Sequence, residues 1–174
     1  MNAEFESLQI EDVPPERRPS LQSLLEESFE GWYLSHSRKT LMSVDLVREA
    51  VVGDRPVGMV MLKTFSGYIG YVYYIAVARE YRRRKVGTRL LDHSLGYFSS
   101  TGMREVYASV EEDNEESAGL FRSRGFTKTS YREVARRYGP IRALDLYRRM
   151  LVVPGEALLF RPLGGQLEHG QATA

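Results

Sequence analysis

Four consecutive cations stand before a glycine and a threonine in the stretch REYRRRKVGT. The stretch follows an apolar segment and precedes apolar residues at helical spacing, so it lies at a turn from a strand into a helix. The first turn of a helix leaves N–H groups unpaired, and the helix dipole adds positive charge there. Phosphate binds at such places, and guanidinium groups add charged donors. The turn therefore predicts a site for a pyrophosphate, with candidate residues Arg82, Arg83, Arg84, Lys85, Gly87 and Thr88.

Two other interpretations of the basic run stay open. The charges can form a solvated face, as most exposed charges do. They can also bind nucleic acid, but base stacking needs exposed aromatic side chains beside the charges, and only Tyr81 is adjacent. The chain has 24 basic and 23 acidic residues, a net charge of +1, so it lacks the basic surplus of a nucleic-acid-binding domain. We therefore expect no nucleic-acid partner.

The composition excludes several kinds of site. The 174 residues contain no cysteine, which rules out disulfides, thiolate metal sites and a cysteine nucleophile. Three widely spaced histidines lack the spacing of metal ligands, so we expect no metal site. No apolar run approaches the roughly 18–20 residues that span a bilayer, and the acidic first residues do not resemble a secretory signal. We expect a cytoplasmic protein without a membrane segment.

Hydrophobic periodicity predicts the elements that position this turn. Helices are expected over 21–29, 86–101 and 114–125, and a loop with at most a short helix over 31–43. Strands are expected over 5–10, 46–52, 56–65, 70–77, 105–111, 126–131 and 146–153. We expect one domain over 1–163 and a disordered tail over 164–174. The alternation of strands and helices in the second half predicts an α/β fold with a mixed sheet, in which ligands bind where strands end and helices begin.

Two segments carry a family resemblance. YYIAVAREYRRRKVGTRLLDHSL resembles motif A of the GNAT superfamily of acetyl-CoA-dependent N-acetyltransferases, with Arg82 opening the motif and Gly87 closing it. NEESAGLFRSRGF resembles motif B, in which an Asn precedes a short helix and a Gly-Phe pair; Asn114 and Gly125-Phe126 match. The resemblance covers about residues 44–152. Both motifs fall in the right order on the expected elements, which makes the pair specific.

The resemblance implies a fold, a cosubstrate and a reaction. The fold is a mixed, mostly antiparallel central sheet of about seven strands flanked by helices, splayed between the fourth and fifth strands. Acetyl-CoA is the cosubstrate, and an amine attacks its acetyl carbonyl directly, helped by a backbone amide near Val77. Backbone groups of the fourth strand pair with the pantetheine arm, and amides of the basic turn hold the pyrophosphate. Beyond the turn residues already named, the implied cofactor-binding residues are Ile75, Ala76, Val77, Val86, Asn114, Ser117 and Phe121.

Three positions depart from the family pattern. Lys85 replaces the first motif glycine, and we expect its backbone to stay right-handed, which avoids the cost of a left-handed residue. Phe121 replaces a tyrosine that often protonates the leaving thiolate. Ser109 replaces a Glu or His that serves as base in some relatives; Glu111 lies on the same strand face and is the substitute candidate, unless its acidic run only faces solvent.

Two tyrosines complete the catalytic candidates. Tyr71 and Tyr73 lie on one face of the central strand. A tyrosine with a pKa near 10 is a poor base, so these side chains are candidates for positioning water, with core packing as the alternative. The catalytic candidates are thus Tyr71, Tyr73 and Glu111.

The absence of an obvious strong base bears on which kind of amine the site accepts. A chain α-amine has a pKa near 8 and a lysine amine one near 10.4, so the α-amine gives up its proton more easily. The motif A segment also looks most like the ribosomal-protein N-terminal acetyltransferase branch. We therefore expect a protein or peptide N-terminus as acceptor, with Trp32 and Tyr33 on one wall and Tyr138 on the other. A lysine, a small-molecule amine or a catalytically inactive acyl-CoA sensor are the alternatives, and the chain is expected to be a monomer or homodimer.

Overall fold

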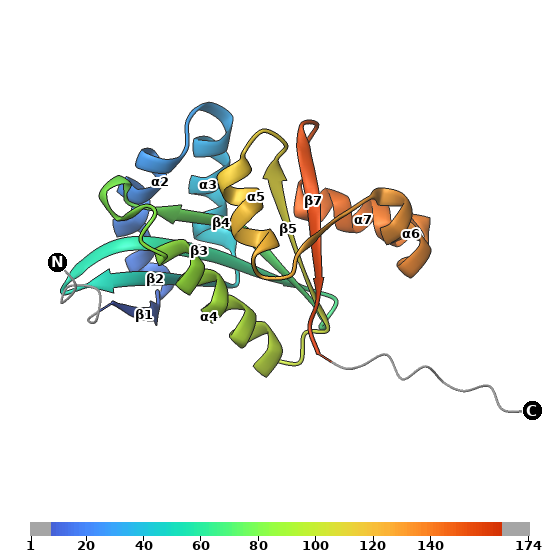
Figure 1. The fold of residues 1–174 in the computed structure, drawn as a ribbon, viewed down its shortest axis with the longest axis horizontal. Coiled ribbons are helices and arrows are strands. Elements are labelled where there is room, and N and C mark those ends of the chain that lie inside the picture. Colours follow the sequence, from blue (N-terminus) through green and yellow to red (C-terminus); the bar gives the residue numbers. More distant parts are fainter. Residues whose placement is uncertain (1–7, 165–174) are drawn as a thin grey trace, which may run out of the picture.

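One mixed sheet with helices on both faces organises the chain (Figure 1). The structure is a computed structural model and describes residues 8–164. Seven strands within these residues lie in the order β1-β2-β3-β4-β5-β7-β6. The strands are β1 (Gln9–Asp12), β2 (Leu46–Val52), β3 (Arg55–Phe65), β4 (Ile69–Val77), β5 (Glu105–Glu111), β6 (Thr127–Thr129) and β7 (Glu156–Pro162). The helices are η1 (Pro15–Leu21), α2 (Gln22–Ser28), α3 (Gly31–Ser43), η2 (Arg79–Tyr81), α4 (Val86–Ser100), α5 (Glu115–Arg122), α6 (Tyr131–Tyr138) and α7 (Pro140–Met150).

The sheet opens between β4 and β5, which form its one parallel pair within the described residues. Their register runs from Ile69 opposite Glu105 to Val72 opposite Ala108. Both strands continue beyond it, β4 to Val77 and β5 to Glu111. The backbone edge of the second half of β4 therefore faces a gap rather than a partner strand. This confirms the expected splay between the fourth and fifth strands and the expected sheet of about seven strands.

A β-bulge in β4 lies at the point where the strands part. Met61 of β3 pairs with Tyr74, but the next residue, Leu62, pairs with Val72, so Tyr73 is the extra residue. A bulge breaks the alternation of side chains between the two faces of a sheet. Tyr73 and Tyr74 consequently both pack toward the α2–α3 side. Ile75 resumes the alternation and packs toward the opposite face.

Helix α4 covers one face of the sheet and helices α2, α3 and α7 cover the other (Figure 1). The predicted stripe of α4 is buried as expected, with Val86, Leu90, Leu91, Leu95 and Phe98 in one core cluster. Within the described residues, no helix is both long enough and apolar enough to cross a membrane.

Two expected elements were wrong. The segment 31–43 is a full helix, α3, whose buried Ser37, Thr40 and Leu41 pack against the sheet although its apolar pattern is weak. Residues 146–153 are not a strand, because the first five form the end of α7. The apolar side chains Ala143, Leu146 and Met150 lie on one buried helix face, so the helical period prevails over the strand period.

Local signals explain the helical hairpin α6–α7. Ser130 caps α6 in a capping box with Glu133. Gly139, at φ +83°, ends α6, and Pro140 then opens α7 at a position that needs no N–H donor. The last strand consequently lies later than expected, at β7. The expected first strand begins before residue 8, partly outside the described residues, and residues 165–174 of the expected tail also lie outside them.

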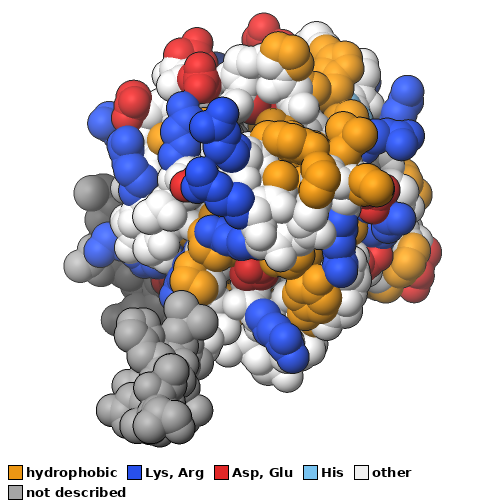
Figure 2. All heavy atoms as spheres, turned by 90° about the vertical axis from the view of Figure 1, so that its right-hand side faces the viewer, with side chains coloured by type: hydrophobic (Ala, Val, Ile, Leu, Met, Phe, Trp, Pro, Cys, Tyr) orange, Lys and Arg blue, Asp and Glu red, His pale blue; other side chains and the backbone are white. Residues whose placement is uncertain are grey.

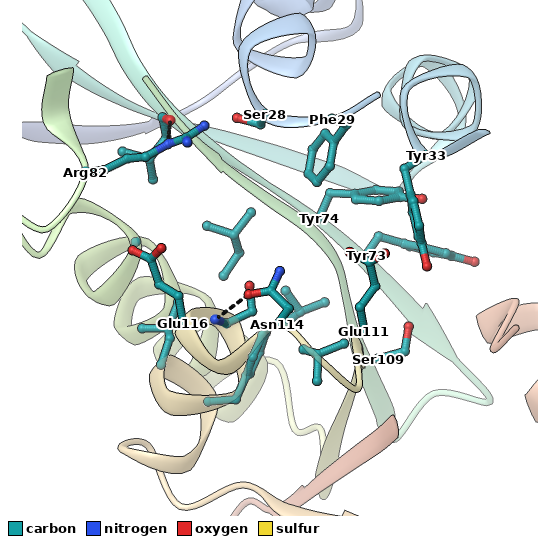
Figure 3. A pocket seen from close by; sticks show the side chains of 18 of the residues that line it. Ser28, Phe29, Tyr33, Tyr73, Tyr74, Arg82, Ser109, Glu111, Asn114 and Glu116 are labelled. Atoms are coloured by element: carbon teal, nitrogen blue, oxygen red, sulfur yellow. Dashed lines mark hydrogen bonds between the residues drawn. The ribbon is translucent and has the colours of Figure 1, made fainter. Parts of the chain in front are cut away.

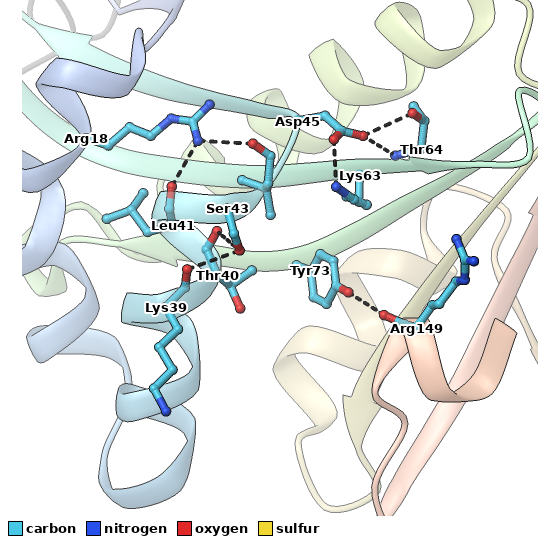
Figure 4. A network of polar contacts seen from close by, with 11 residues as sticks. Arg18, Lys39, Thr40, Leu41, Ser43, Asp45, Lys63, Thr64, Tyr73 and Arg149 are labelled. Atoms are coloured by element: carbon cyan, nitrogen blue, oxygen red, sulfur yellow. Dashed lines mark hydrogen bonds and ion pairs between the residues drawn. The ribbon is translucent and has the colours of Figure 1, made fainter. Parts of the chain in front are cut away.

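Polar contacts fix the ends of α3 and α7 (Figure 4). The buried guanidinium of Arg18 donates to the backbone oxygens of Leu41 and Val44, at 3.1 and 3.0 Å, and so anchors the end of α3. The Tyr73 hydroxyl donates to the backbone oxygen of Arg149 near the end of α7. The bulged strand is thereby tied directly to the helix that forms the opposite wall of the gap.

Candidate active site

A cavity of about 440 Å³ passes through the gap between β4 and β5 (Figure 3). Its volume is in the usual range for small-ligand sites. One end lies at the turn before α4 and is bordered by α5. The other end lies on the opposite face of the sheet, between α3, the end of α7 and the start of β7. A ligand that threads the gap would therefore contact the basic turn at one end and the α3 wall at the other.

The basic turn has an unusual backbone. Arg83 and Lys85 are both left-handed, with φ of +59° and +61°. The expectation that Lys85 stays right-handed was wrong: Lys85 is the N-cap of α4, and its left-handed conformation turns the chain into the helix. For a residue with a Cβ this costs roughly 1–2 kcal/mol. Left-handed residues alternating with right-handed ones can curl successive N–H groups around an anion, which is the arrangement that a phosphate needs.

The cations of the turn differ in their roles. The Arg82 guanidinium donates to the backbone oxygens of Val77, at 3.1 Å, and Glu27, at 2.9 Å, so it fastens the turn to the strand end and to α2. Arg82, Arg83 and Lys85 line the cavity. Arg84 does not; its guanidinium lies 5.7 Å from the centre of the Tyr81 ring.

The middle of the cavity is a narrow, mainly apolar passage. A Cβ added to Gly87 would lie 3.5 Å from Leu120 and 3.8 Å from both Ile75 and Val77, so this glycine keeps the passage open between α4, α5 and β4. Asn114 caps α5 by accepting from the Ser117 amide at 3.0 Å. The other expected cofactor-binding residues that line the cavity are Val86, Thr88, Ser117 and Phe121, whereas the Ala76 side chain packs on the opposite side of β4.

This geometry fits an acyl-CoA. The left-handed turn and the helix start offer amides and cations to the diphosphate. The free edge of β4 offers backbone groups to the pantetheine arm, and Gly87 leaves space for it beside Ile75. Phe121 is 5% exposed and packs edge-on against Phe126, with ring centres 5.0 Å apart. Its ring carries no proton donor, so its place in the structure is that of a packing residue.

Aromatic side chains line the end of the cavity that lies on the α3 side. Trp32 stacks on the His36 ring, with centroids 5.1 Å apart and planes within 4°, and Phe29 packs edge-on against Tyr74 at 5.0 Å. Trp32 and Tyr33, the residues expected on one acceptor wall, both line the cavity. The expectation for Tyr138 was wrong. It lies on α6, where its ring packs near Tyr68 at 6.3 Å, because residues 131–150 form a helical hairpin.

The three catalytic candidates lie in different environments. Tyr71 is 1% exposed and does not line the cavity. Its hydroxyl donates to the Met150 backbone oxygen at 3.0 Å and lies 2.9 Å from Ser109 Oγ, and burial raises its pKa. Tyr73 lines the cavity, and burial raises its pKa too. Glu111 also lines the cavity and points into it from β5 (Figure 3).

The sequence analysis missed several polar residues of the cavity, among them His36, Tyr74 and Glu156. His36 Nδ1 lies 2.7 Å from the Tyr74 hydroxyl, and the Tyr33 hydroxyl donates to Glu156 Oε1 at 3.2 Å. Burial is the main cause that raises the pKa of Tyr33 and of Tyr74, and Glu156 adds to both shifts. Burial and then Lys39 lower the pKa of His36. Helical spacing of Trp32 and His36 could have revealed His36, but no sequence signal marked the bulge that turns Tyr74 or the late start of β7.

Comparisons with known proteins agree with this geometry. The family model "Acetyltransferase (GNAT) family" matches residues 4–126. N-alpha-acetyltransferase 30 of Schizosaccharomyces pombe is 28% identical over 106 residues, which are 59% of this chain and 68% of that protein. The fold resembles that of the ribosomal-protein-S18-alanine N-acetyltransferase from Escherichia coli, with a TM-score of 0.69 and 15% identity over 93% of this chain and 97% of that one.

A second solved structure carries the same fold. Naa50 of Arabidopsis thaliana, in complex with the bisubstrate analogue CoA-Ac-MVNAL, aligns with a TM-score of 0.65 and 20% identity over 89% of this chain and 98% of that one. The family match covers more than half of the chain, and the splayed sheet with its basic turn is in place. The chain therefore belongs to the GNAT acetyltransferase family and is an acetyl-CoA-dependent N-acetyltransferase.

Proposed function

We propose that this enzyme acetylates the α-amine at the N-terminus of proteins or peptides. The observation that carries the proposal is the cavity that passes between β4 and β5 and joins the basic turn to an aromatic chamber on the other face. Acetyl-CoA enters from the α4 side and the acceptor from the α3 side, so that amine and thioester meet in the gap. The relationship to an N-alpha-acetyltransferase supports an α-amine as acceptor.

The chain's own residues have distinct roles in this proposal. Amides from Arg83 to Thr88 hold the diphosphate, assisted by the cations of Arg83 and Lys85. Backbone groups of Ile75, Ala76 and Val77 hold the pantetheine arm, and a backbone amide near Val77 polarises the acetyl carbonyl. Asn114, Ser117 and Phe121 form the wall on the α5 side. Holding the two reactants in one narrow passage supplies much of the rate.

The acceptor chamber is formed by Trp32 and Tyr33 on one side and by Met150, Leu151 and Glu156 on the other. Glu111 points into it from the remaining side. Aromatic faces and carboxylates both favour a cationic group, which suits an N-terminal ammonium.

A small-molecule amine is the second candidate acceptor, and one contact favours it. The hydrogen bond between Tyr33 on α3 and Glu156 on β7 joins the two walls of the chamber. If this bridge persists during turnover, the chamber admits only a compact acceptor. A peptide acceptor requires that the bridge opens or that the peptide backbone passes beside it.

Product analysis separates these acceptors. The purified chain is incubated with acetyl-CoA and peptides that carry a free N-terminus, the same peptides with a blocked N-terminus and an internal lysine, and a set of small primary amines. Mass spectrometry locates the acetyl group, and thiol release measures the rate. We expect acetylation of free N-termini only. Acetylation restricted to small amines would overturn the proposal, and acetyl-CoA binding without transfer to any amine would identify an acyl-CoA sensor instead.

A further inference from the structure

The acceptor amine must lose a proton, but the position where the family resemblance places a general base does not hold one. An α-amine with a pKa near 8 is mostly an ammonium ion at neutral pH and must lose a proton before it attacks a carbonyl. Ser109 occupies one such position, and its hydroxyl lies 2.9 Å from that of Tyr71. Phe121, at the position of the expected acid, has no proton to exchange. The side chains on the acceptor side of the cavity therefore decide this step.

His36 is placed on that side by two local features. Helix α3 carries Trp32 and His36 one turn apart, so the two rings stack, and His36 lines the cavity. The bulge at Tyr73 turns Tyr74 toward the same side, which brings its hydroxyl to 2.7 Å from His36 Nδ1. The segments that meet here are far apart in the sequence, and their meeting depends on the splay of the sheet.

The hydrogen bond to Tyr74 fits a tautomer in which Nε2 is the unprotonated ring nitrogen. The Thr40 hydroxyl oxygen lies 3.3 Å from Nδ1 and 3.5 Å from Nε2. When Nδ1–H donates to the Tyr74 oxygen, Nε2 keeps its lone pair and can take a proton. The imidazolium that results donates from Nδ1 to the same oxygen, so protonation needs no rearrangement of this contact. Thr40 gives its hydroxyl proton to the backbone oxygen of His36 at 2.9 Å, which further fixes this part of α3.

We propose that His36 is the catalytic base of this acetyltransferase and that Tyr74 is its positioning residue. The inference rests on the proposed acetylation of an amine. The acceptor ammonium gives one proton to His36 Nε2, and its nitrogen then forms a bond to the acetyl carbonyl carbon. When the C–S bond breaks, the electron pair leaves with the coenzyme A sulfur. The nitrogen loses its second proton to that thiolate, and His36 returns the first to solvent.

The surroundings keep His36 ready to accept a proton. Its pKa lies below the ordinary value of 6.5, chiefly because of burial and then because of Lys39 on the same helix, so the ring is neutral at pH 7. The titratable groups that line this side of the cavity are Tyr33 from α3, Tyr73 and Tyr74 from β4, Glu111 from β5 and Glu156 from β7. Ser28 at the end of α2 and Phe29 after it carry no charge. The two carboxylates favour the approach of an ammonium to this side of the cavity.

The test is the pH dependence of kcat/KM for the acceptor that the wild-type enzyme uses. We expect a loss of activity on the acid side, with an apparent pKa below 6.5, in the wild-type enzyme. His36→Gln should lower kcat/KM at pH 7 by about 100-fold or more, abolish this acid limb, and regain activity as the pH rises through the pKa of the amine. Tyr74→Phe should lower activity less and move the acid limb to lower pH, because the imidazolium loses its acceptor.

The matched control is His93→Gln, which removes an exposed histidine of α4 outside the cavity and should leave rate and pH profile unchanged. His36→Ala should recover activity with added imidazole, which a purely structural role would not permit. Stabilisation by acetyl-CoA shows that each variant is folded.

Failure of the inference and failure of the proposed function have different signatures. A folded His36→Gln enzyme with the rate and pH profile of the wild type overturns the role of His36 and leaves the proposed function intact. A wild-type enzyme that acetylates only amines other than N-termini overturns the proposed acceptor, and the same variants then test His36 with that amine. A wild-type enzyme without any transfer to amines overturns both.

Discussion

Lys85 shows how one residue can serve a site at a cost to the fold. Its left-handed backbone, φ +61°, aims the start of α4 at the cavity, a conformation that glycine adopts without strain. The lysine keeps the conformation because it is the N-cap of a well-packed helix. The side chain adds a cation at the end of the cavity that we propose for the diphosphate, which a glycine cannot supply.

Replacing Lys85 by Gly and by Ala separates strain from charge. Both changes remove the cation, but only Gly removes the Cβ that makes a left-handed backbone costly. We expect Lys85→Gly to be more stable than Lys85→Ala by roughly 1 kcal/mol in the free energy of unfolding, measured by urea denaturation. Both should bind acetyl-CoA more weakly than the wild type, because both lack the charge. Equal stability of the two variants would show that this residue is not left-handed in solution.

The sequence predicts which residues line the cavity where they belong to a motif, but not where only the tertiary structure brings them there. Asn114, Gly87 and the basic turn stand in recognisable patterns, and all of them line the cavity or flank it. His36 and Glu156 belong to no such pattern. They reach the cavity because α3 is a complete helix and because β7 begins at residue 156, and neither boundary followed from local periodicity.

Helix α4 connects the end of the cavity at the basic turn to the hydrophobic core. Its buried stripe, including Leu90 and Phe98, fixes the helix on the sheet, while its first turn faces the cavity. Two glycines of this helix allow the role of its first turn to be separated from the role of its buried face. Gly87 lies in the narrow passage beside Leu120 and Ile75, whereas a Cβ on Gly96 would meet nothing within 4 Å.

We expect Gly87→Ala and Gly96→Ala to have similar effects on stability and different effects on binding. Alanine is favoured over glycine inside a helix by roughly 0.5–1 kcal/mol, so neither change should lower the free energy of unfolding. Only Gly87→Ala narrows the passage proposed for the pantetheine arm. It should therefore weaken acetyl-CoA binding, measured by calorimetry, by about tenfold or more, which corresponds to about 1.4 kcal/mol of binding free energy. Equal affinity in both variants would place the pantetheine arm elsewhere.

Elements with a strong amphipathic period were predictable and elements defined by tertiary contacts were not. The strands β2 to β5 and the helices α4 and α5 match the sequence-based expectations closely. Helix α3 was missed because its apolar residues are few and its buried face includes Ser37 and Thr40. The end of α7 was taken for a strand because a run of apolar and β-branched residues follows Met150, although Gly139 and Pro140 mark the start of a helix.

Charge is unevenly distributed over the molecule. The α6–α7 hairpin carries six of the 24 basic residues and two of the 23 acidic ones, although the whole chain has a net charge of only +1. Figure 2 shows the side of the molecule where this hairpin lies in Figure 1, with cationic side chains beside exposed apolar ones. Ile141 of α7 is an exposed apolar residue of the hairpin. Arg82, Arg83 and Lys85 of the turn before α4 are a separate group, which lines the cavity.

Binding of acetyl-CoA should stabilise the whole molecule, because the proposed site joins the turn before α4, both splayed strands and α5. At a concentration 100 times the dissociation constant, a ligand that binds only the folded chain adds about 2.7 kcal/mol. For a domain of this size that corresponds to a rise in Tm of about 5–11 °C, measured by thermal unfolding. Pantetheine, which lacks the diphosphate, should give a much smaller shift at the same concentration, because it cannot contact the basic turn. An equal shift with both compounds would show that the cations and amides of that turn do not hold the diphosphate.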